Sequence, residues 1–343
     1  MIGPVRPPSV AARRTAAERV AGLAKPTGAL GRLEDVAVWL AGCQDRCPPD
    51  PPRNVRAVVF AGDHGVAAHG VSAYPAAVTA AMVRQFHAGG AGVSVLARQH
   101  DVRLRVLDIA VDDDLADLPA AVREFKVRRS SGAIHLTDAL AAREVTAALA
   151  AGRAVAQQEV EAGADLLISG DMGIGNTTPA AALIAAVLGL PADEVTGRGT
   201  GVDDGTLAHK IDVIERALAR SAGRADDPAD LLAALGSADI AASAAFMARG
   251  AELGVPVLLD GVISVAAALV ADRLAPGAAQ WFAAGHRSTE PAQSPALDKL
   301  GLVPLLDLGM RLGEGSGAVA AVPLVRSAAL LLADMALLSD VLG

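Results

Sequence analysis

Short apolar runs of strand-forming composition recur along the chain, and each closes on glycine or polar residues before a helical stretch begins. This alternation is typical of a parallel sheet whose strands are joined by crossover helices. The pattern therefore predicts an α/β fold, with the polar residues that close each run at the ligand-binding edge of the sheet. The five units are VRAVVFAGDHG (55–65), LRVLDIAVD (104–112), ADLLISGDMGIG (164–175), VPVLLDG (255–261) and AQWFAAGHRS (279–288).

The two ends of the chain have a helical pattern instead. TAAERVAGLAKP (15–26) and GALGRLEDVAVWLAGC (28–43) precede a proline-rich linker, CPPDPP, and residues 317–342 read as one long apolar helix. We expect this last helix to pack with the first two. The predicted organisation is an N-terminal helical part at 1–50, an α/β domain at 53–310, and a loop with a C-terminal helix at 311–343 that completes a small helical domain.

Composition restricts the partners. Of the 343 residues 52% are hydrophobic but only 2% aromatic, so the core must be built from Ala, Val and Leu. A net charge of -8 without a Lys/Arg cluster argues against nucleic acid and favours a small-molecule partner. Residues 1–14 lack the apolar centre of a signal peptide, and no long uninterrupted apolar segment predicts a membrane span. We expect a cytoplasmic location, with Cys43 and Cys47 as incidental thiols.

The most informative segment is ISGDMGIGNTTPAAALIAAVLG, residues 168–189. A strand is expected to end at Ser169, and a glycine-rich turn leads to a helix that begins around Asn176, Thr177 and Thr178. Such a turn directs free backbone N–H groups and the positive end of the helix dipole at a phosphate or carboxylate. A plain capped helix is the alternative. The spacing is neither a P-loop nor a dinucleotide fingerprint, so a nucleoside monophosphate fits better than ATP or NAD.

A second glycine-rich turn, GRGTG (197–201), leads into a helix that carries Lys210. Lys210 is expected in or near the first turn, where the dipole disfavours a cation unless an anion compensates. It is therefore a candidate phosphate counter-ion. The alternative is a solvated lysine paired with Asp203, Asp204 or Asp212.

Glu314 stands between Gly313 and Gly315, just ahead of the last helix. Its glycine neighbours give it little side-chain cover, so the backbone can approach a ligand while the carboxylate faces a cavity. This position suits a general base. A glutamate that merely favours the start of a helix is the alternative.

Further polar clusters close other strands: Asp63 with His64, Asp260 alone, and His286 with Ser288 and Glu290. Asp63, His64, His69 and Glu290 are the candidates for a metal site, but no pair of them has a recognised ligand spacing. We therefore expect turn or ribose contacts rather than a metal site.

Taken together, these stretches resemble the nicotinate-nucleotide–dimethylbenzimidazole phosphoribosyltransferase family over nearly the whole chain. Six motifs in colinear order make the resemblance specific. They are KPTGALGRLE (25–34), FAGDHGVAAHGVSAYP (60–75), GDMGIGNTTPAAAL (170–183), GRGTG (197–201), LDGVIS (259–264) and LDLGMRLGEGSGA (306–318).

The resemblance implies a Rossmann-like domain, a small helical domain from both chain ends, and a homodimer in which the small domain helps to cover the partner's active site. It implies transfer of phosphoribose from nicotinate mononucleotide to a benzimidazole-type base, with Glu314 as general base and no cofactor. A base that works near neutral pH needs a raised pKa. The residues implied to hold the 5′-phosphate or ribose are Asp171, Gly173, Gly175, Asn176, Thr177, Thr178, Lys210 and Ser288.

Two positions depart from the family pattern. Asp171 stands where many relatives have Glu, and Ala81 stands before Met82 where they tend to have Gln. A roomier or less polar base pocket would follow from Ala81, so the acceptor stays open between dimethylbenzimidazole and adenine, benzimidazole or a phenol. A non-catalytic nucleotide-binding protein is the rival of another class, and intact Glu314 argues against it. A dehydrogenase is disfavoured because the glycine-rich loop lacks the dinucleotide spacing.

Overall fold

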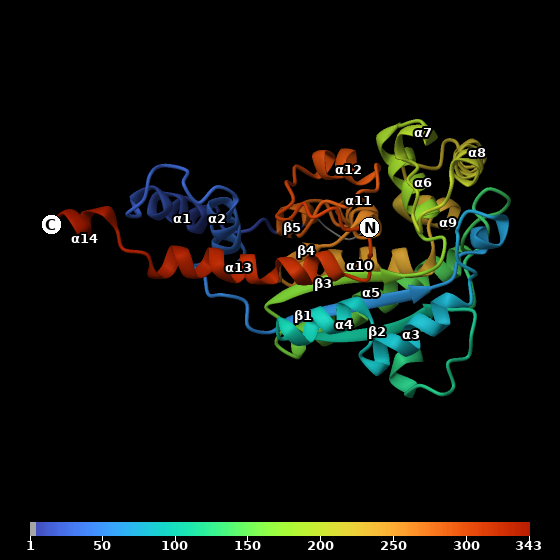
Figure 1. Cartoon of the computed structure of the whole chain (residues 1–343), viewed down its shortest axis with the longest axis horizontal. Helices are drawn as coiled ribbons and strands as arrows, with labels where there is room; N and C mark the ends of the chain where they lie inside the picture. Colours follow the sequence, from blue (N-terminus) through green and yellow to red (C-terminus); the bar gives the residue numbers. More distant parts are fainter. Residues whose placement is uncertain (1–4) are drawn as a thin grey trace.

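A parallel sheet forms the centre of the computed structural model, which describes residues 5–343 (Figure 1). Its five strands run in the order β2-β1-β3-β4-β5, and every neighbouring pair is parallel. Each of the five predicted runs overlaps one strand, and β2 starts two residues before its run, so the α/β prediction is confirmed. The strands are β1 (Val55–Gly62), β2 (Val102–Ala110), β3 (Leu166–Met172), β4 (Val257–Leu259) and β5 (Phe282–Ala284).

Helices connect these strands and cover both faces of the sheet (Figure 1). The α-helices are α1 (Val10–Gly22), α2 (Arg32–Gln44), α3 (Val78–Ala88), α4 (Gly92–Gln99), α5 (Ala142–Glu161), α6 (Thr177–Leu188), α7 (Ala192–Val195), α8 (Asp204–Arg220), α9 (Pro228–Leu235), α10 (Ala238–Glu252), α11 (Val262–Leu274), α12 (Gln293–Leu300), α13 (Ser316–Asp334) and α14 (Leu338–Leu342). Three short 3-10 helices are η1 (Gly65–His69), η2 (Ala120–Arg123) and η3 (Ala278–Trp281).

Successive side chains of a strand point to opposite faces of the sheet, so the core has two layers. Val58 and Phe60 of β1 point into the layer formed with α5, α6 and α9 to α11. Ala57 and Val59, one residue out of phase, point into the layer formed with α2, α4 and α13. A sheet that is apolar on both faces must be covered on both, which is the physical reason for the sandwich.

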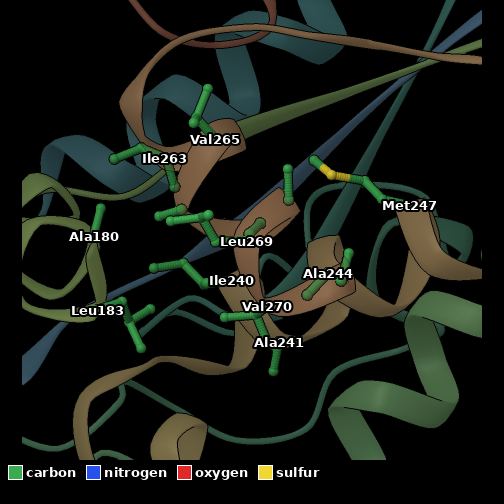
Figure 2. Packing of buried hydrophobic residues seen from close by; sticks show 14 of the residues in the cluster. Ala180, Leu183, Ile240, Ala241, Ala244, Met247, Ile263, Val265, Leu269 and Val270 are labelled. Atoms are coloured by element: carbon green, nitrogen blue, oxygen red, sulfur yellow. The ribbon is translucent and has the colours of Figure 1, made fainter. Parts of the chain in front are cut away.

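Small residues let the helices of the first layer approach closely. Figure 2 shows Ala180 of α6, Ala244 of α10 and Val265 of α11 in one cluster of buried apolar side chains. One close approach lies between α5 and α10, where a β-carbon added at Gly152 would lie 2.0 Å from the carbonyl oxygen of Ala242. The alanine-rich, aromatic-poor composition is therefore used for dense helix packing.

The two chain ends meet on the other layer. Side chains of α1, α2 and α13 share one apolar cluster with β3, and the guanidinium of Arg19 donates to the carbonyl oxygens of Leu332 (2.6 Å) and Ala333 (2.9 Å). By length and composition α13 could cross a membrane, but 56% of its most apolar window is buried inside the protein. Internal packing therefore accounts for its apolar composition.

Several predicted boundaries were wrong. β3 continues to Met172 instead of ending at Ser169, because residues 166–172 pair along most of β1. The stretch 317–342 is two helices, since α13 ends at Asp334 and α14 starts only at Leu338. Lys210 lies two turns into α8, whose first residue is Asp204 and whose N-cap is Asp203. Residues 1–4 lie outside the described residues. They belong to the predicted N-terminal helical part and to the 1–14 stretch considered for a signal peptide.

We predict that Gly152→Ala lowers the free energy of unfolding by about 1–3 kcal/mol, because the added methyl group overpacks α5 against α10. Chemical denaturation followed by circular dichroism measures the change. Gly205→Ala is the matched control, since a β-carbon there meets only Asp203 Oδ1 at 3.7 Å. The control should be neutral or stabilising by up to about 1 kcal/mol. Equal stability of wild type and Gly152→Ala would refute the packing argument.

Candidate active site

A cavity of about 490 Å³ opens beyond the carboxyl ends of β3, β4 and β5. Ligands bind at this edge in open parallel sheets. Its walls come from the segment before α3, the start of α6, the 197–201 loop, and the loop before α13. Most of the predicted site residues line it: Asp171, Gly173, Gly175, Asn176, Thr177, Ser288 and Glu314. Thr178 and Lys210 do not, and Thr178 is fully buried beneath the start of α6.

The start of α6 leaves backbone donors free. Within residues 5–343, the N–H groups of Gly175 and Thr177 donate to no protein acceptor, whereas that of Ile174 donates to Thr79 Oγ1 at 3.1 Å. Gly175 has φ +87°, a left-handed conformation that glycine adopts without strain. Asn176 precedes the helix but does not cap it, because its side chain is engaged elsewhere. Two unpaired amides at a helix N-terminus are suited to an anion.

Asp171 connects the cavity to a buried group of ionisable residues. Its Oδ1 accepts a hydrogen bond from Asn176 Nδ2 at 2.7 Å, and the carboxyl of Asp239 is near enough to act on its pKa. Burial, together with the Asp239 charge, raises the pKa of Asp171 well above its usual range. Asp239 is itself buried, and His64 Nε2 lies 3.3 Å from its Oδ2. Burial opposes ionisation of Asp239, but His64 and the other hydrogen-bond donors around it outweigh burial and lower its pKa. Of the two carboxyls, Asp171 is therefore the one that holds a proton more readily.

Lys210 is buried below the 197–201 loop, with 1% of its surface exposed. Its Nζ donates to Thr177 Oγ1 at 2.7 Å and to the carbonyl oxygen of Gly197 at 3.0 Å. The alternative of a solvated lysine paired with Asp203, Asp204 or Asp212 is thus wrong. Burial lowers the pKa of Lys210 to about 8, although the charge of Glu290 acts in the opposite direction. The lysine places positive charge directly behind the first residue of α6.

The 197–201 loop is held from three sides. Glu290 Oε1 accepts from the Gly199 amide at 2.8 Å, and Gly197 lies so close that a β-carbon there would be 2.1 Å from Glu290 Oε2. Arg311 donates to the carbonyl oxygen of Gly199 at 2.6 Å. Thr200 Oγ1 accepts from the Ala73 amide at 2.9 Å. The loop therefore links the wall before α3 to the loop that carries Glu314.

Glu314 lies against the centre of the sheet. A β-carbon at Gly170 of β3 would be 2.3 Å from the Glu314 carbonyl oxygen, so only glycine admits the loop here. Glu314 has φ +65°, and its Oε2 accepts from the Val93 amide of α4 at 3.1 Å. Burial, assisted by the charge of Asp260, raises the pKa of Glu314, with the Val93 bond opposing. A carboxylate with a raised pKa in a cavity is suited to accept a proton.

Sequence reasoning missed several polar residues of the cavity lining, among them Thr200 and Arg311. Thr200 stands between two glycines of GRGTG, and Arg311 lies three residues before Glu314, so proximity to these motifs was the available signal. Ala81 is not part of the cavity wall, whereas its neighbour Met82 is. Among residues 5–343, no group of three His, Cys, Asp or Glu side chains is arranged to hold a metal ion.

A parallel sheet, unpaired amides at the start of α6 and a carboxylate of raised pKa around one cavity are features of an α/β enzyme. A family model described as "Phosphoribosyltransferase" matches residues 5–341. The chain therefore belongs to the phosphoribosyltransferase family. Within it, the chain belongs to the nicotinate-nucleotide–dimethylbenzimidazole type, by which its relatives are named.

Two relatives named nicotinate-nucleotide–dimethylbenzimidazole phosphoribosyltransferase match almost end to end. The protein of Mycobacterium marinum is 52% identical over 99% of this chain and 95% of its own. That of Mycobacterium avium is 53% identical over 97% and 95%. The crystal structure of CobT from Thermus thermophilus superimposes with a TM-score of 0.91 at 44% identity, covering 96% of this chain and 98% of that one.

We predict that Glu290→Gln lowers the pKa of Lys210 below about 8, because the substitution removes the charge that opposes the effect of burial. The carbon NMR signal of the lysine side chain, followed against pH, measures this pKa; the other lysines are Lys25, Lys126 and Lys299. Glu194→Gln, an exposed site on α7, should leave the titration unchanged. An unaltered titration in Glu290→Gln would contradict the electrostatic link.

Proposed function

We propose that this enzyme transfers the phosphoribosyl group of nicotinate mononucleotide to 5,6-dimethylbenzimidazole, giving nicotinate and α-ribazole 5′-phosphate, the lower-ligand precursor of cobalamin. The observation that carries the proposal is that the anion-binding start of α6 and the carboxylate of Glu314 face one cavity. A phosphate anchored at one wall and a base at another leave the ribose between them. The names of the relatives supply the substrates.

The 5′-phosphate is proposed to lie at the free amides of Gly175 and Thr177. Asn176 and Ser288, in the wall of the same cavity, would contact phosphate or ribose. Lys210 acts from behind: its bond to Thr177 Oγ1 orients that hydroxyl, and its positive charge adds to the helix dipole. Lys210 is thus expected to strengthen phosphate binding without direct contact in the ligand-free geometry.

Glu314 is proposed to take the proton from one ring nitrogen of the acceptor base. The other ring nitrogen then attacks the anomeric carbon and forms the new C–N bond. The bond from that carbon to the nicotinate nitrogen breaks, and its electron pair neutralises the pyridinium. Because the leaving group departs neutral at this nitrogen, positioning and base catalysis suffice, and the step requires no cofactor.

The lining of the cavity favours a largely apolar acceptor. Val78, Met82, Ile174 and Leu312 are among its walls. Adenine carries an amino group and further ring nitrogens, which would lose water without gaining partners from such side chains. Dimethylbenzimidazole is therefore the preferred acceptor, with plain benzimidazole next.

We further propose a cytoplasmic homodimer in which the small domain, formed by residues 1–50 and 311–343, helps to cover the partner's active site. Large apolar side chains near the C-terminus are exposed in the single chain, notably Leu330 (46%), Val341 (61%) and Leu342 (75%). Exposed apolar groups gathered on one projecting segment are typical of a surface that pairs with another chain.

The proposal is tested by following nicotinate release from nicotinate mononucleotide with dimethylbenzimidazole, with adenine, and without an acceptor. Release that depends on dimethylbenzimidazole is expected. Release with adenine alone would preserve the chemistry and change the acceptor. An absence of release under all three conditions would support the rival, a non-catalytic nucleotide-binding protein.

We predict that Glu314→Gln lowers kcat by at least about 100-fold, because general base catalysis typically contributes that much. Nicotinate mononucleotide binding, measured by calorimetry, should change little, since the phosphate is held at another wall. In wild type, kcat should fall with decreasing pH through the raised pKa of Glu314, because the protonated carboxyl accepts no proton. Near-normal turnover of the glutamine variant would exclude Glu314 as the base.

We predict that Lys210→Ala weakens nicotinate mononucleotide binding by about tenfold, equivalent to about 1.4 kcal/mol. The affinity of wild type should also decline as pH rises through about 8, because Lys210 then loses its charge. Calorimetric titrations on either side of this pH measure both effects, and the variant should lose the pH-dependent part. An unchanged dissociation constant would show that Lys210 serves only the fold.

A further inference from the structure

The helix that follows Glu314 begins without a cap of its own. Gly315 occupies the N-cap position of α13 with φ +87° and has no side chain to accept from the first amides. A larger residue would be crowded by β3, since even the β-carbon of an alanine at 315 would lie 3.3 Å from the Gly170 α-carbon. The free amides at the start of α13 must therefore find an acceptor elsewhere.

That acceptor is the carboxylate of Asp260, which follows β4. Its Oδ2 accepts from the Gly315 amide at 3.0 Å, and its Oδ1 accepts from the amides of Gly317 (2.8 Å) and Ala318 (3.1 Å). A single side chain, distant in sequence, thus binds the residue directly after Glu314 and the first turn of the helix beyond it. Charge-assisted bonds of this kind are stronger than neutral ones.

Asp260 is itself held in place and is only 3% exposed. Its amide donates to Ser264 Oγ at 3.1 Å, and its carbonyl oxygen accepts from Gln293 Nε2 at 3.1 Å. His286 Nε2 lies 3.4 Å from Asp260 Oδ1. The carboxylate therefore acts as a rigid attachment point between the sheet edge and the Glu314 loop.

Resting on the proposed role of Glu314, we infer that Asp260 is the positioning residue for the base: its carboxylate holds the 313–318 segment so that Glu314 keeps its left-handed conformation and faces the cavity. The conformation needs such support, because a residue with a β-carbon at φ +65° is strained by about 1–2 kcal/mol. Asp260 acts through Glu314 and needs no contact with the reacting atoms.

The charge of Asp260 has a second consequence. Burial is the larger cause of the raised pKa of Glu314, and the negative charge of Asp260 is the other cause that raises it. The other ionisable groups that line the cavity are Asp171 on β3, Tyr74 before α3, His286 and Glu290 after β5, and Arg311 on the same loop. On the packed helices, Arg98 of α4 donates to the Gly89 carbonyl oxygen and Arg326 of α13 to that of His100. Asp260 is thus expected to set both the place and the basicity of Glu314.

Asp260→Asn tests the inference. The asparagine side chain keeps one acceptor oxygen, but its NH2 group faces a backbone N–H that the second carboxylate oxygen had bound. The loop is therefore expected to loosen. The substitution also removes the negative charge. We expect kcat to fall by at least about tenfold while KM for nicotinate mononucleotide changes less than about threefold, as for an interaction that matters only in the transition state. The acid limb of the kcat–pH profile should move to lower pH. The longer Asp260→Glu should lower kcat without moving that limb.

Asp227→Asn is the matched control, because Asp227 caps α9 through the amides of Ala229 (2.7 Å) and Asp230 (3.0 Å), away from the cavity. It should lower thermal stability without changing kcat or the pH profile. In the Glu314→Gln background, Asp260→Asn should produce little further loss of kcat, because a positioning residue has no effect once the base is gone.

Two readouts do not depend on turnover. Amide hydrogen exchange at Gly315, Gly317 and Ala318 should accelerate in Asp260→Asn, and the carboxyl NMR titration assigned to Glu314 by its loss in Glu314→Gln should shift to lower pH. If the wild-type protein does not transfer phosphoribose, the proposed function is overturned. The exchange and titration readouts would still show whether Asp260 holds the Glu314 loop in place. If Asp260→Asn has the same kcat, the same acid limb of the pH profile and the same amide exchange rates as the wild type, the inference is overturned. Should Asp260→Asn fail to fold, wild-type kcat in Asp260→Glu would overturn it.

Discussion

The close approach between β3 and the loop of Glu314 is the constraint on which the site depends. At Gly170 there is no room for a side chain, because a β-carbon would lie 2.3 Å from the Glu314 carbonyl oxygen. The missing side chain lets a segment near the C-terminus lie on the central strand, next to the cavity wall formed by the start of α6. The carboxylate of Glu314 and the start of α6, nearly 140 residues apart in sequence, face one cavity for this reason.

The ionisable groups around the cavity have different environments and therefore different tasks. Burial beside the carboxyl of Asp239 raises the pKa of Asp171, whose Oδ1 accepts a hydrogen bond from Asn176 Nδ2 and so orients that side chain. Burial and the charge of Asp260 raise the pKa of Glu314, while the hydrogen bond from the Val93 amide limits the rise. Lys210 is buried with a lowered pKa, and its Nζ donates to Thr177 Oγ1 at the start of α6. One cavity thus holds a carboxylate and a buried lysine in different environments, which is the arrangement that the proposed base and the proposed phosphate site require.

Dense packing of small residues provides the rigid frame for this arrangement. The contact of Gly152 with Ala242 brings α5 against α10, and α10 carries Asp239 in its first turn. A shift of α10 would therefore change the environment of Asp171 directly. The alanine-rich composition noted in the sequence serves the site as well as the core, because closely packed helices deform little.

The sequence by itself determined the five parallel strand units, the glycine-rich turn before α6 and the prominence of Glu314, because these depend on local periodicity and turn chemistry. It did not determine the environment of Lys210, which local reasoning left between a buried counter-ion and a surface pair. It also could not show that Asp260 caps α13 or that Thr200 and Arg311 join the cavity walls. Those contacts link residues far apart in sequence, so only the crossing of strands, loops and helices in the tertiary structure decided them.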